Sequence, residues 1–230
     1  MNDHVFGDRT QAGRVLAAAL AQRHLPDPVV LALPRGGVPV AVEVALALHA
    51  PLDLLIVRKI GAPGNPELAV GAIAEGADAA VVDRETLAAT GTSRAYVERQ
   101  AKVELQEIAR RRALYLQGRP PLAVEGRTVI VVDDGLATGS TARAAVRALR
   151  ARKPARLVLA VPVAPPEAVA ELQAEVDELV CLSTPEFFGA VGVHYADFRQ
   201  VGDEEVIAAL ARVDHATPAP QWVAGASGTA

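Results

Sequence analysis

The chain has a single cysteine, Cys181, among its 230 residues, so no disulfide bond can form within it. One free thiol fits a reducing compartment. Aromatic residues make up only 3% of the sequence, whereas hydrophobic residues make up 51%, with Ala, Val and Leu dominating. A chain of this length and composition can bury the core of one α/β domain, or of a domain with a subdomain.

Strong charge of one sign and long apolar runs are also missing. The formal net charge of −4 provides no basic field for nucleic acid, so we expect no nucleic-acid partner. Glu43 breaks the longest apolar segment below membrane-spanning length. Asp3, Asp8 and Arg9 interrupt the beginning of the chain, which is unlike a signal peptide. We therefore expect no membrane partner and a cytoplasmic location.

Several common motifs are absent as well. The sequence contains no G-x-x-x-x-G-K-[ST] loop, no G-x-G-x-x-G fingerprint and no G-x-S-x-G elbow. It contains neither H-E-x-x-H nor a cysteine cluster, which argues against a structural zinc site.

Apolar runs alternate with amphipathic stretches, which predicts an α/β fold with a parallel, doubly wound sheet of about five strands flanked by helices. We expect one domain over residues 1–215, an inserted subdomain over about 61–126, and a disordered, proline-containing tail over 216–230. The insert is expected to hold a hairpin of 69–74 with 79–82 and a helix from 92 or 93 to about 115. Elsewhere we expect strands at 29–33, 52–57, 128–132, 156–163 and 178–182, and helices at 11–23, 39–49, 141–151, 167–176 and 204–213.

Residues 129–141 carry the most functional information. Four β-branched apolar residues predict a strand buried on both faces, and a helix is expected to begin near Ser140. Between them, Gly139 allows the backbone to turn its N–H groups inward, and Thr138, Ser140 and Thr141 add hydroxyls. Together with the amides and dipole of the helix N-terminus, these groups predict a site for a phosphate monoester. The alternative is that Thr138 or Ser140 only caps the helix.

Two adjacent carboxylates, Asp133 and Asp134, follow the same strand. Like charges side by side cost free energy unless a partner compensates them. A sugar diol could donate hydrogen bonds to the carboxylates, and Mg²⁺ prefers oxygen ligands. The alternative is a solvated acidic turn.

This segment resembles the signature by which type I phosphoribosyltransferases bind 5-phosphoribosyl-1-pyrophosphate (PRPP). The resemblance implies that Asp133 and Asp134 contact the ribose hydroxyls, with Mg²⁺ as cofactor held mostly through PRPP and water. It also implies that the loop from Ala137 to Thr141 holds the 5-phosphate. In 6-oxopurine members an acidic residue with a proton-transfer role usually stands where this chain has Ala137, which weakens an assignment to purine salvage.

Two further basic segments fit the same crevice. Pro34-Arg35-Gly36-Gly37 follows the expected first strand, where ligands of such sheets bind, and in the family this loop grips pyrophosphate. We expect Arg58 and Lys59 to end the second strand and to neutralise the leaving group. In the family a mobile loop after this strand closes over the site, and residues 61–71 fit such a lid. Glu67 is a candidate to bind Mg²⁺ or to order the loop. The alternatives are an ordinary turn with a surface arginine, and a solvated charge pair before a flexible connection.

Residues 185–198 hold half of the aromatic side chains. They loosely resemble the base-recognition segment of hypoxanthine-type phosphoribosyltransferases, which makes Phe187, Phe188, Val191 and Tyr195 candidates for binding the acceptor. The alternative is that these rings anchor the segment to the core. We interpret His194 as structural.

Taken together, Pro-Arg-Gly-Gly-Val-Pro, Val-Arg-Lys-Ile-Gly and Val-Asp-Asp-Gly-Leu-Ala-Thr-Gly resemble a phosphoribosyltransferase branch of unknown acceptor over about residues 8–213. The resemblance implies the type I fold with a hood or lid subdomain, and a pentosyltransferase that uses PRPP and an unidentified nitrogenous acceptor in nucleotide metabolism. A homodimer is one arrangement to consider. Two alternatives are a PRPP or nucleotide sensor without turnover and a signalling receiver domain. The implied catalytic residues are Arg35, Lys59, Asp133 and Asp134, and the implied PRPP-binding residues are these with Gly36, Gly37, Arg58, Ala137, Thr138, Gly139, Ser140 and Thr141.

Overall fold

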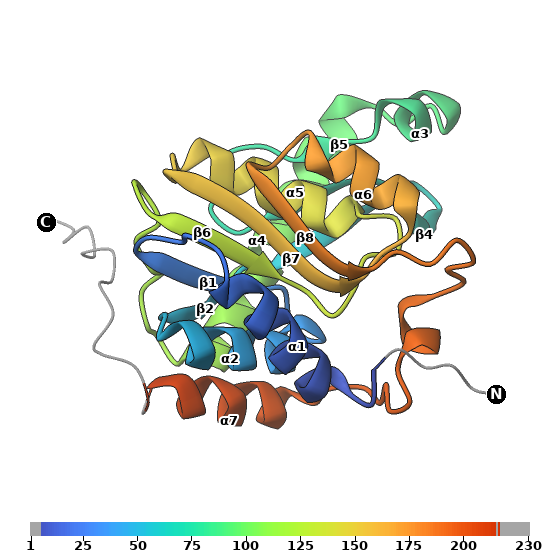
Figure 1. Ribbon diagram of the computed structural model, residues 1–230. Coiled ribbons are helices and arrows are strands. Elements are labelled where there is room, and N and C mark those ends of the chain that lie inside the picture. Colours follow the sequence, from blue (N-terminus) through green and yellow to red (C-terminus); the bar gives the residue numbers. More distant parts are fainter. Residues whose placement is uncertain (1–5, 215, 217–230) are drawn as a thin grey trace, which may run out of the picture.

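The computed structural model describes residues 6–214 and 216, which form two separate sheets (Figure 1). The larger sheet has five strands, all parallel, as the sequence predicts. In spatial order they are β2 (Leu52–Leu54), β1 (Pro28–Ala32), β6 (Thr128–Val132), β7 (Arg156–Val163) and β8 (Glu178–Ser183).

Helices cover both faces of this sheet, because alternate residues of its buried strands point to opposite sides. Val129 and Val131 belong to one core cluster, with α5 (Ser140–Ala151) and α6 (Pro166–Gln173). Ile130 and Val132 belong to the other, with α1 (Arg9–Ala21), α2 (Gly37–Leu48) and α7 (Asp203–Asp214). Figure 1 shows the two layers on either side of the sheet.

The second sheet is antiparallel and lies in the stretch that the sequence predicts as an insert. It consists of β3 (Val57–Ala62), β4 (Asn65–Ala74) and β5 (Val81–Val82), followed by α3 (Arg84–Ala89) and α4 (Arg94–Leu116). The predicted pairing of β4 with β5 and the long helix are confirmed. The short helix α3 was not predicted, because it buries no residue and so leaves no apolar stripe in the sequence.

Two predictions about this region are wrong. Arg58 and Lys59 do not end the second strand of the parallel sheet but lie inside β3. Residues 61–71 are not a long loop: β3 and β4 pair from Val57↔Ala74 to Ala62↔Asn65 and leave a turn of two residues. Gly64, with a φ of 77°, adopts the left-handed conformation that this tight turn needs.

A buried ion-pair cluster ties the insert to the parallel sheet. Asp53 of β2 is 2% exposed and accepts hydrogen bonds from Arg112 of α4 and from the Leu122 N–H, at 3.1 and 2.9 Å. Arg112 also pairs with Glu75 at 2.9 Å. Burial raises the pKa of Glu75, and the Arg112 guanidinium opposes that shift. The position of the second sheet is therefore coupled to β2.

No helix within residues 6–214 is both long and apolar enough to cross a membrane. The predicted tail, apart from Ala216, lies outside the described residues.

Candidate active site

The site forms where β1 and β6 end side by side, since Ala32 pairs with Val132 in parallel register. The loops that follow these two strands pack backbone against backbone. A Cβ atom on Gly37 would lie 2.7 Å from the Val132 carbonyl oxygen and 2.9 Å from the Asp133 Cα. Only glycine fits there, and the contact joins the 34–37 turn to the acidic pair.

The loop after β6 is where the sequence predicts an anion site. Gly139 has a φ of 69° and is the residue before α5. The Ser140 N–H donates to Thr138 Oγ1 at 3.4 Å, so Thr138 partly caps the helix, as one alternative predicts. The Thr138 and Ser140 hydroxyl oxygens lie 2.9 Å apart. The loop lines a pocket of about 170 Å³, into which the first turn of α5 brings its amides. This arrangement suits a phosphate monoester.

Asp133 and Lys59 line the same pocket, together with Val191. The Asp134 N–H donates to Asp133 Oδ1 at 2.9 Å. Burial and the neighbouring Asp134 carboxylate raise the pKa of Asp133 well above its usual value. Its ionised form is therefore stabilised by whatever hydrogen-bond donor or cation enters the pocket.

Asp134 is placed differently from Asp133. Its carboxylate lies 2.7 Å from Arg9 Nε, the side chain is 13% exposed, and it does not line the phosphate pocket. Arg9 is fixed in turn, with its guanidinium 3.7 Å above the Phe198 ring and Nη1 donating to the Arg199 carbonyl oxygen at 2.9 Å. Burial raises the pKa of Asp134, and the Arg9 guanidinium opposes that shift.

Arg9 is a residue of the site that the sequence does not predict. Asp8 caps α1 by accepting the Gln11 N–H at 2.7 Å, so the helix begins at Arg9 and aims that side chain at the site. The capping residue is visible in the sequence, but no local pattern connects the first turn of α1 with an acid 125 residues away.

Lys59 stands between two pockets. A second pocket of about 560 Å³ shares Lys59 and Thr141 with the phosphate pocket and extends over Pro34 and Arg58 toward α4. Arg58 pairs with Glu104 at 2.9 Å, whereas Lys59 has no ion pair within the described part of the chain. Lys59 is therefore an exposed cation that lines both pockets, which together we call the crevice.

Arg35 lines neither of these two pockets. Its Nη1 lies 3.4 Å from Asp203 Oδ1, which also accepts the Tyr115 hydroxyl at 2.7 Å. In the same turn, the Gly37 N–H donates to the Leu33 carbonyl oxygen at 3.1 Å. Contact of Arg35 with a ligand in the crevice requires release from Asp203.

The four candidates for acceptor binding do not line one surface. Phe187 is 93% exposed, and Val191 is the one of the four that reaches the phosphate pocket. Tyr195 is buried between Phe6 and Phe198 and donates to the Asp134 carbonyl oxygen at 2.6 Å. Phe188 packs on His194, whose Nε2 lies 2.9 Å from the Phe188 carbonyl oxygen. These contacts match the alternative that the rings anchor this segment, and they match a structural His194.

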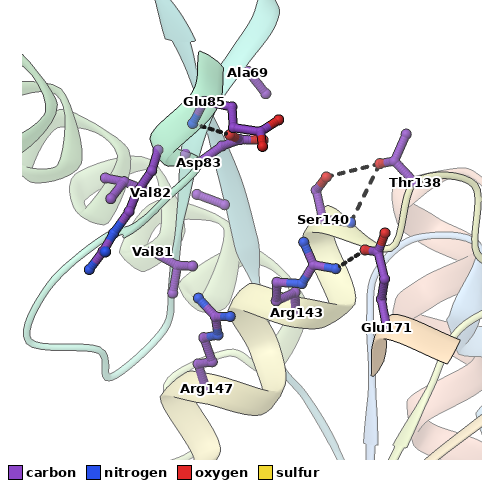
Figure 2. A pocket seen from close by; sticks show the side chains of 13 residues that line it. Ala69, Val81, Val82, Asp83, Glu85, Thr138, Ser140, Arg143, Arg147 and Glu171 are labelled. Atoms are coloured by element: carbon purple, nitrogen blue, oxygen red, sulfur yellow. Dashed lines mark hydrogen bonds and ion pairs between the residues drawn. The ribbon is translucent and has the colours of Figure 1, made fainter. Parts of the chain in front are cut away.

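A third pocket, of about 550 Å³, also touches Thr138 and Ser140 but has another electrostatic character (Figure 2). Its arginines on α5 are already paired, Arg143 with Glu171 and Arg147 with Glu175. Arg84, which also lines this pocket, is exposed and has no ion pair within the described residues, so a free cation is common to both pockets. The pocket beside Asp133 differs in being lined by that acid and by the loop from Leu136 to Thr141.

The residues beside the loop can hold Mg²⁺ if the substrate and water supply most of its ligands. No group of three His, Cys, Asp or Glu side chains within residues 6–214 and 216 could hold a metal ion. Mg²⁺ commonly takes one or two carboxylates and completes its shell with substrate phosphates and water. Asp133 can supply one carboxylate, Asp134 is held by Arg9, and Glu67 is exposed on β4.

The chain is similar in sequence and in structure to known proteins. The profile of the family described as phosphoribosyl transferase domain matches residues 8–197. The chain belongs to this family. It is 48% identical in sequence to TT1426 from Thermus thermophilus, whose crystal structure superposes with a TM-score of 0.78 over 90% of this chain and 98% of that one. Family membership confirms the predicted resemblance and argues against a receiver domain.

Two curated relatives come from Mycobacterium tuberculosis strains and are named "Putative phosphoribosyl transferase MT0597" and "Putative phosphoribosyl transferase Rv0571c". Each is 47% identical over 208 residues, which cover 90% of this chain. The chain spans about half the length, 47%, of these relatives.

Proposed function

We propose that the chain is a phosphoribosyltransferase that binds PRPP with Mg²⁺ and transfers the phosphoribosyl group to a nitrogenous acceptor, releasing pyrophosphate. The observation that carries this proposal is the shared lining of one pocket by Asp133, the exposed cation Lys59 and the loop before α5. Asp133 can accept hydrogen bonds from sugar hydroxyls, Lys59 supplies a positive charge, and the loop can bind a phosphate. Together these groups match the parts of a phosphorylated pentose.

In this proposal the loop at Thr138 to Thr141 binds the 5-phosphate, and Asp133 accepts hydrogen bonds from the ribose hydroxyls. Pyrophosphate extends along the crevice toward Lys59 and the 34–37 turn, where Arg35 reaches it after leaving Asp203. Bound Mg²⁺ supplies positive charge that neutralises the phosphate oxygens. Asp133 is the residue that would hold it, together with oxygens of the substrate and water.

The reaction breaks the bond between the anomeric carbon and the pyrophosphate oxygen, which keeps the electron pair. The acceptor nitrogen attacks from the opposite face, forms the new bond and releases its proton to solvent water. Lys59 stabilises the charge that develops on the leaving group, and Asp133 holds the sugar in position. Catalysis by positioning and charge neutralisation requires no covalent nucleophile.

Calorimetric titration with PRPP and Mg²⁺, followed by a pyrophosphate-release assay over a panel of nucleobases and small amines, tests the proposal. Asp133→Asn and Lys59→Met should each weaken PRPP binding by about 10- to 100-fold, as expected for a lost hydrogen bond or ion pair to a charged group. Lys102→Met, at an exposed position of α4, is the matched control. Failure of the wild-type protein to bind PRPP would refute the proposal.

A second candidate is a PRPP or nucleotide sensor without turnover. Two observations favour it: Ala137 stands where purine enzymes of the family carry an acid, and three of the four proposed acceptor residues do not line the pocket. PRPP binding without pyrophosphate release from any acceptor would support the sensor and contradict the enzyme.

A further inference from the structure

The two neighbouring acids are held in unlike surroundings. Asp133 lines the phosphate pocket, whereas the Asp134 side chain is turned to Arg9. The Asp134 backbone is fixed as well, because its carbonyl oxygen accepts the Tyr195 hydroxyl. We call the group formed by Arg9, Asp134, Tyr195 and Phe198 the Asp134 clasp. It joins the first turn of α1 and the segment after β8 to the loop after β6.

The clasp bears directly on the 34–37 turn. A Cβ atom built on Gly36 would lie 2.0 Å from Asp134 Oδ2, so the carboxylate occupies the space that a side chain at Gly36 would need. The other glycine of the turn, Gly37, packs on Asp133. The turn therefore rests on the two acids, with Asp134 under Gly36.

Charge explains why Arg9 is needed at this point. In the proposed function the 34–37 turn binds pyrophosphate, a polyanion. Without a cation beside it, a carboxylate directly beneath the turn would repel that ligand, because the two charges would be close together and partly shielded from solvent. Arg9 and Asp134, with side chains 10% and 13% exposed, form a pair that is close to neutral and poorly screened by solvent.

We propose that the two acids have different roles: Asp133 contacts the sugar, and Asp134 is a positioning residue that supports the pyrophosphate-binding turn while Arg9 neutralises it. This inference rests on the proposed function and assigns separate parts of the substrate to the two acids.

The test measures binding of inorganic pyrophosphate and of ribose 5-phosphate separately, each with Mg²⁺, by titration calorimetry. Arg9→Gln should weaken pyrophosphate binding by at least about tenfold, because the Asp134 charge is exposed beneath the turn. The affinity of Arg9→Gln for ribose 5-phosphate should stay within about twofold of the wild-type value. Arg9→Lys should recover most of the pyrophosphate affinity. Arg14→Gln is the matched control, because Arg14 lies on the same helix, pairs with Glu43 and is 69% exposed.

The double variant Arg9→Gln/Asp134→Asn separates charge from structure. With the carboxylate removed, pyrophosphate binding should return to within about threefold of the wild-type protein. Equal weakening of both ligands in Arg9→Gln, or no recovery in the double variant, would overturn the inference. So would a loss of ribose 5-phosphate binding in Asp134→Asn alone, since that places Asp134 on the sugar. Failure of the wild-type protein to bind either ligand would instead refute the proposed function.

Discussion

Substitution of Gly36 by alanine tests the packing of the site without reference to any ligand. Gly36 has φ −59° and ψ −37°, a conformation that alanine adopts freely. The new Cβ would nevertheless lie 2.0 Å from Asp134 Oδ2, so the carboxylate has to move away from Arg9. The cost of the substitution therefore comes from one contact and not from backbone strain.

Its size follows from two opposing terms. Forcing an extra methyl group into a packed site costs about 1–3 kcal/mol, and loosening the Arg9–Asp134 pair adds to the upper part of that range. Replacing glycine by alanine at a compatible conformation returns about 0.4–1 kcal/mol through the unfolded state. We expect a net loss of about 2 kcal/mol in the free energy of unfolding. For a chain of this length that corresponds to a fall in Tm of about 4–8 °C.

Urea denaturation and calorimetry of four proteins measure this: wild type, Gly36→Ala, Asp134→Ala and the double variant. In the Asp134→Ala background the obstructing oxygen is absent, so Gly36→Ala should cost less than about 0.5 kcal/mol. Gly7→Ala, where a Cβ meets nothing within 4 Å, is the control. If Gly36→Ala were as stable as wild type, or equally destabilising in both backgrounds, the Gly36–Asp134 contact would not be the cause of the cost.

Three further predictions concern the rest of the fold and site. Arg112→Ala leaves Asp53 buried without its cation and should cost about 3–5 kcal/mol in urea unfolding; full stability would contradict the role of the ion-pair cluster. Gly139→Ala, at a φ of 69° with Leu172 2.9 Å from the new Cβ, should cost more than Gly126→Ala, whose φ is 72° in open space; equal costs would show that the phosphate loop is loosely packed. Because the folded-state pKa of Asp133 lies above 3.8, the folded protein binds the extra proton between pH 3.8 and that pKa, so the carboxyl lowers stability as the pH rises through this window. Asp133→Asn should remove this contribution from the pH–stability curve, and curves that stay parallel would contradict it.

The parallel sheet was predictable because its strands are short apolar runs buried on both faces, and the predicted strand at 156–163 matches β7. The point after β2 at which the chain leaves the parallel sheet for the second sheet was not predictable, because the apolar run continues across that point. The Leu55 N–H still bonds to the Ala32 carbonyl oxygen at 2.9 Å, whereas the Ile56 carbonyl oxygen accepts the Glu75 N–H at 2.8 Å. Leu55 and Ile56 are both buried, so hydrophobic periodicity cannot show where the chain leaves one sheet for the other.

Some parts of the candidate site could also be predicted from the sequence and others could not. The turn at Gly139 and the loop hydroxyls follow one another in sequence, so their proximity in the structure was predictable. The partners that orient the charged side chains are distant: Arg9 is 125 residues from Asp134, and Asp203 is 168 residues from Arg35. These pairings arise from the packing of α1 and α7 around the loops, which no local pattern encodes.

A crystal structure of the protein with PRPP and Mg²⁺ tests the central claim most directly. We predict the 5-phosphate within hydrogen-bond distance of the loop from Thr138 to Thr141, the ribose hydroxyls on Asp133, and the pyrophosphate beside Lys59. A sugar phosphate bound away from this loop, for example against Arg143 in the pocket of Figure 2, would contradict it.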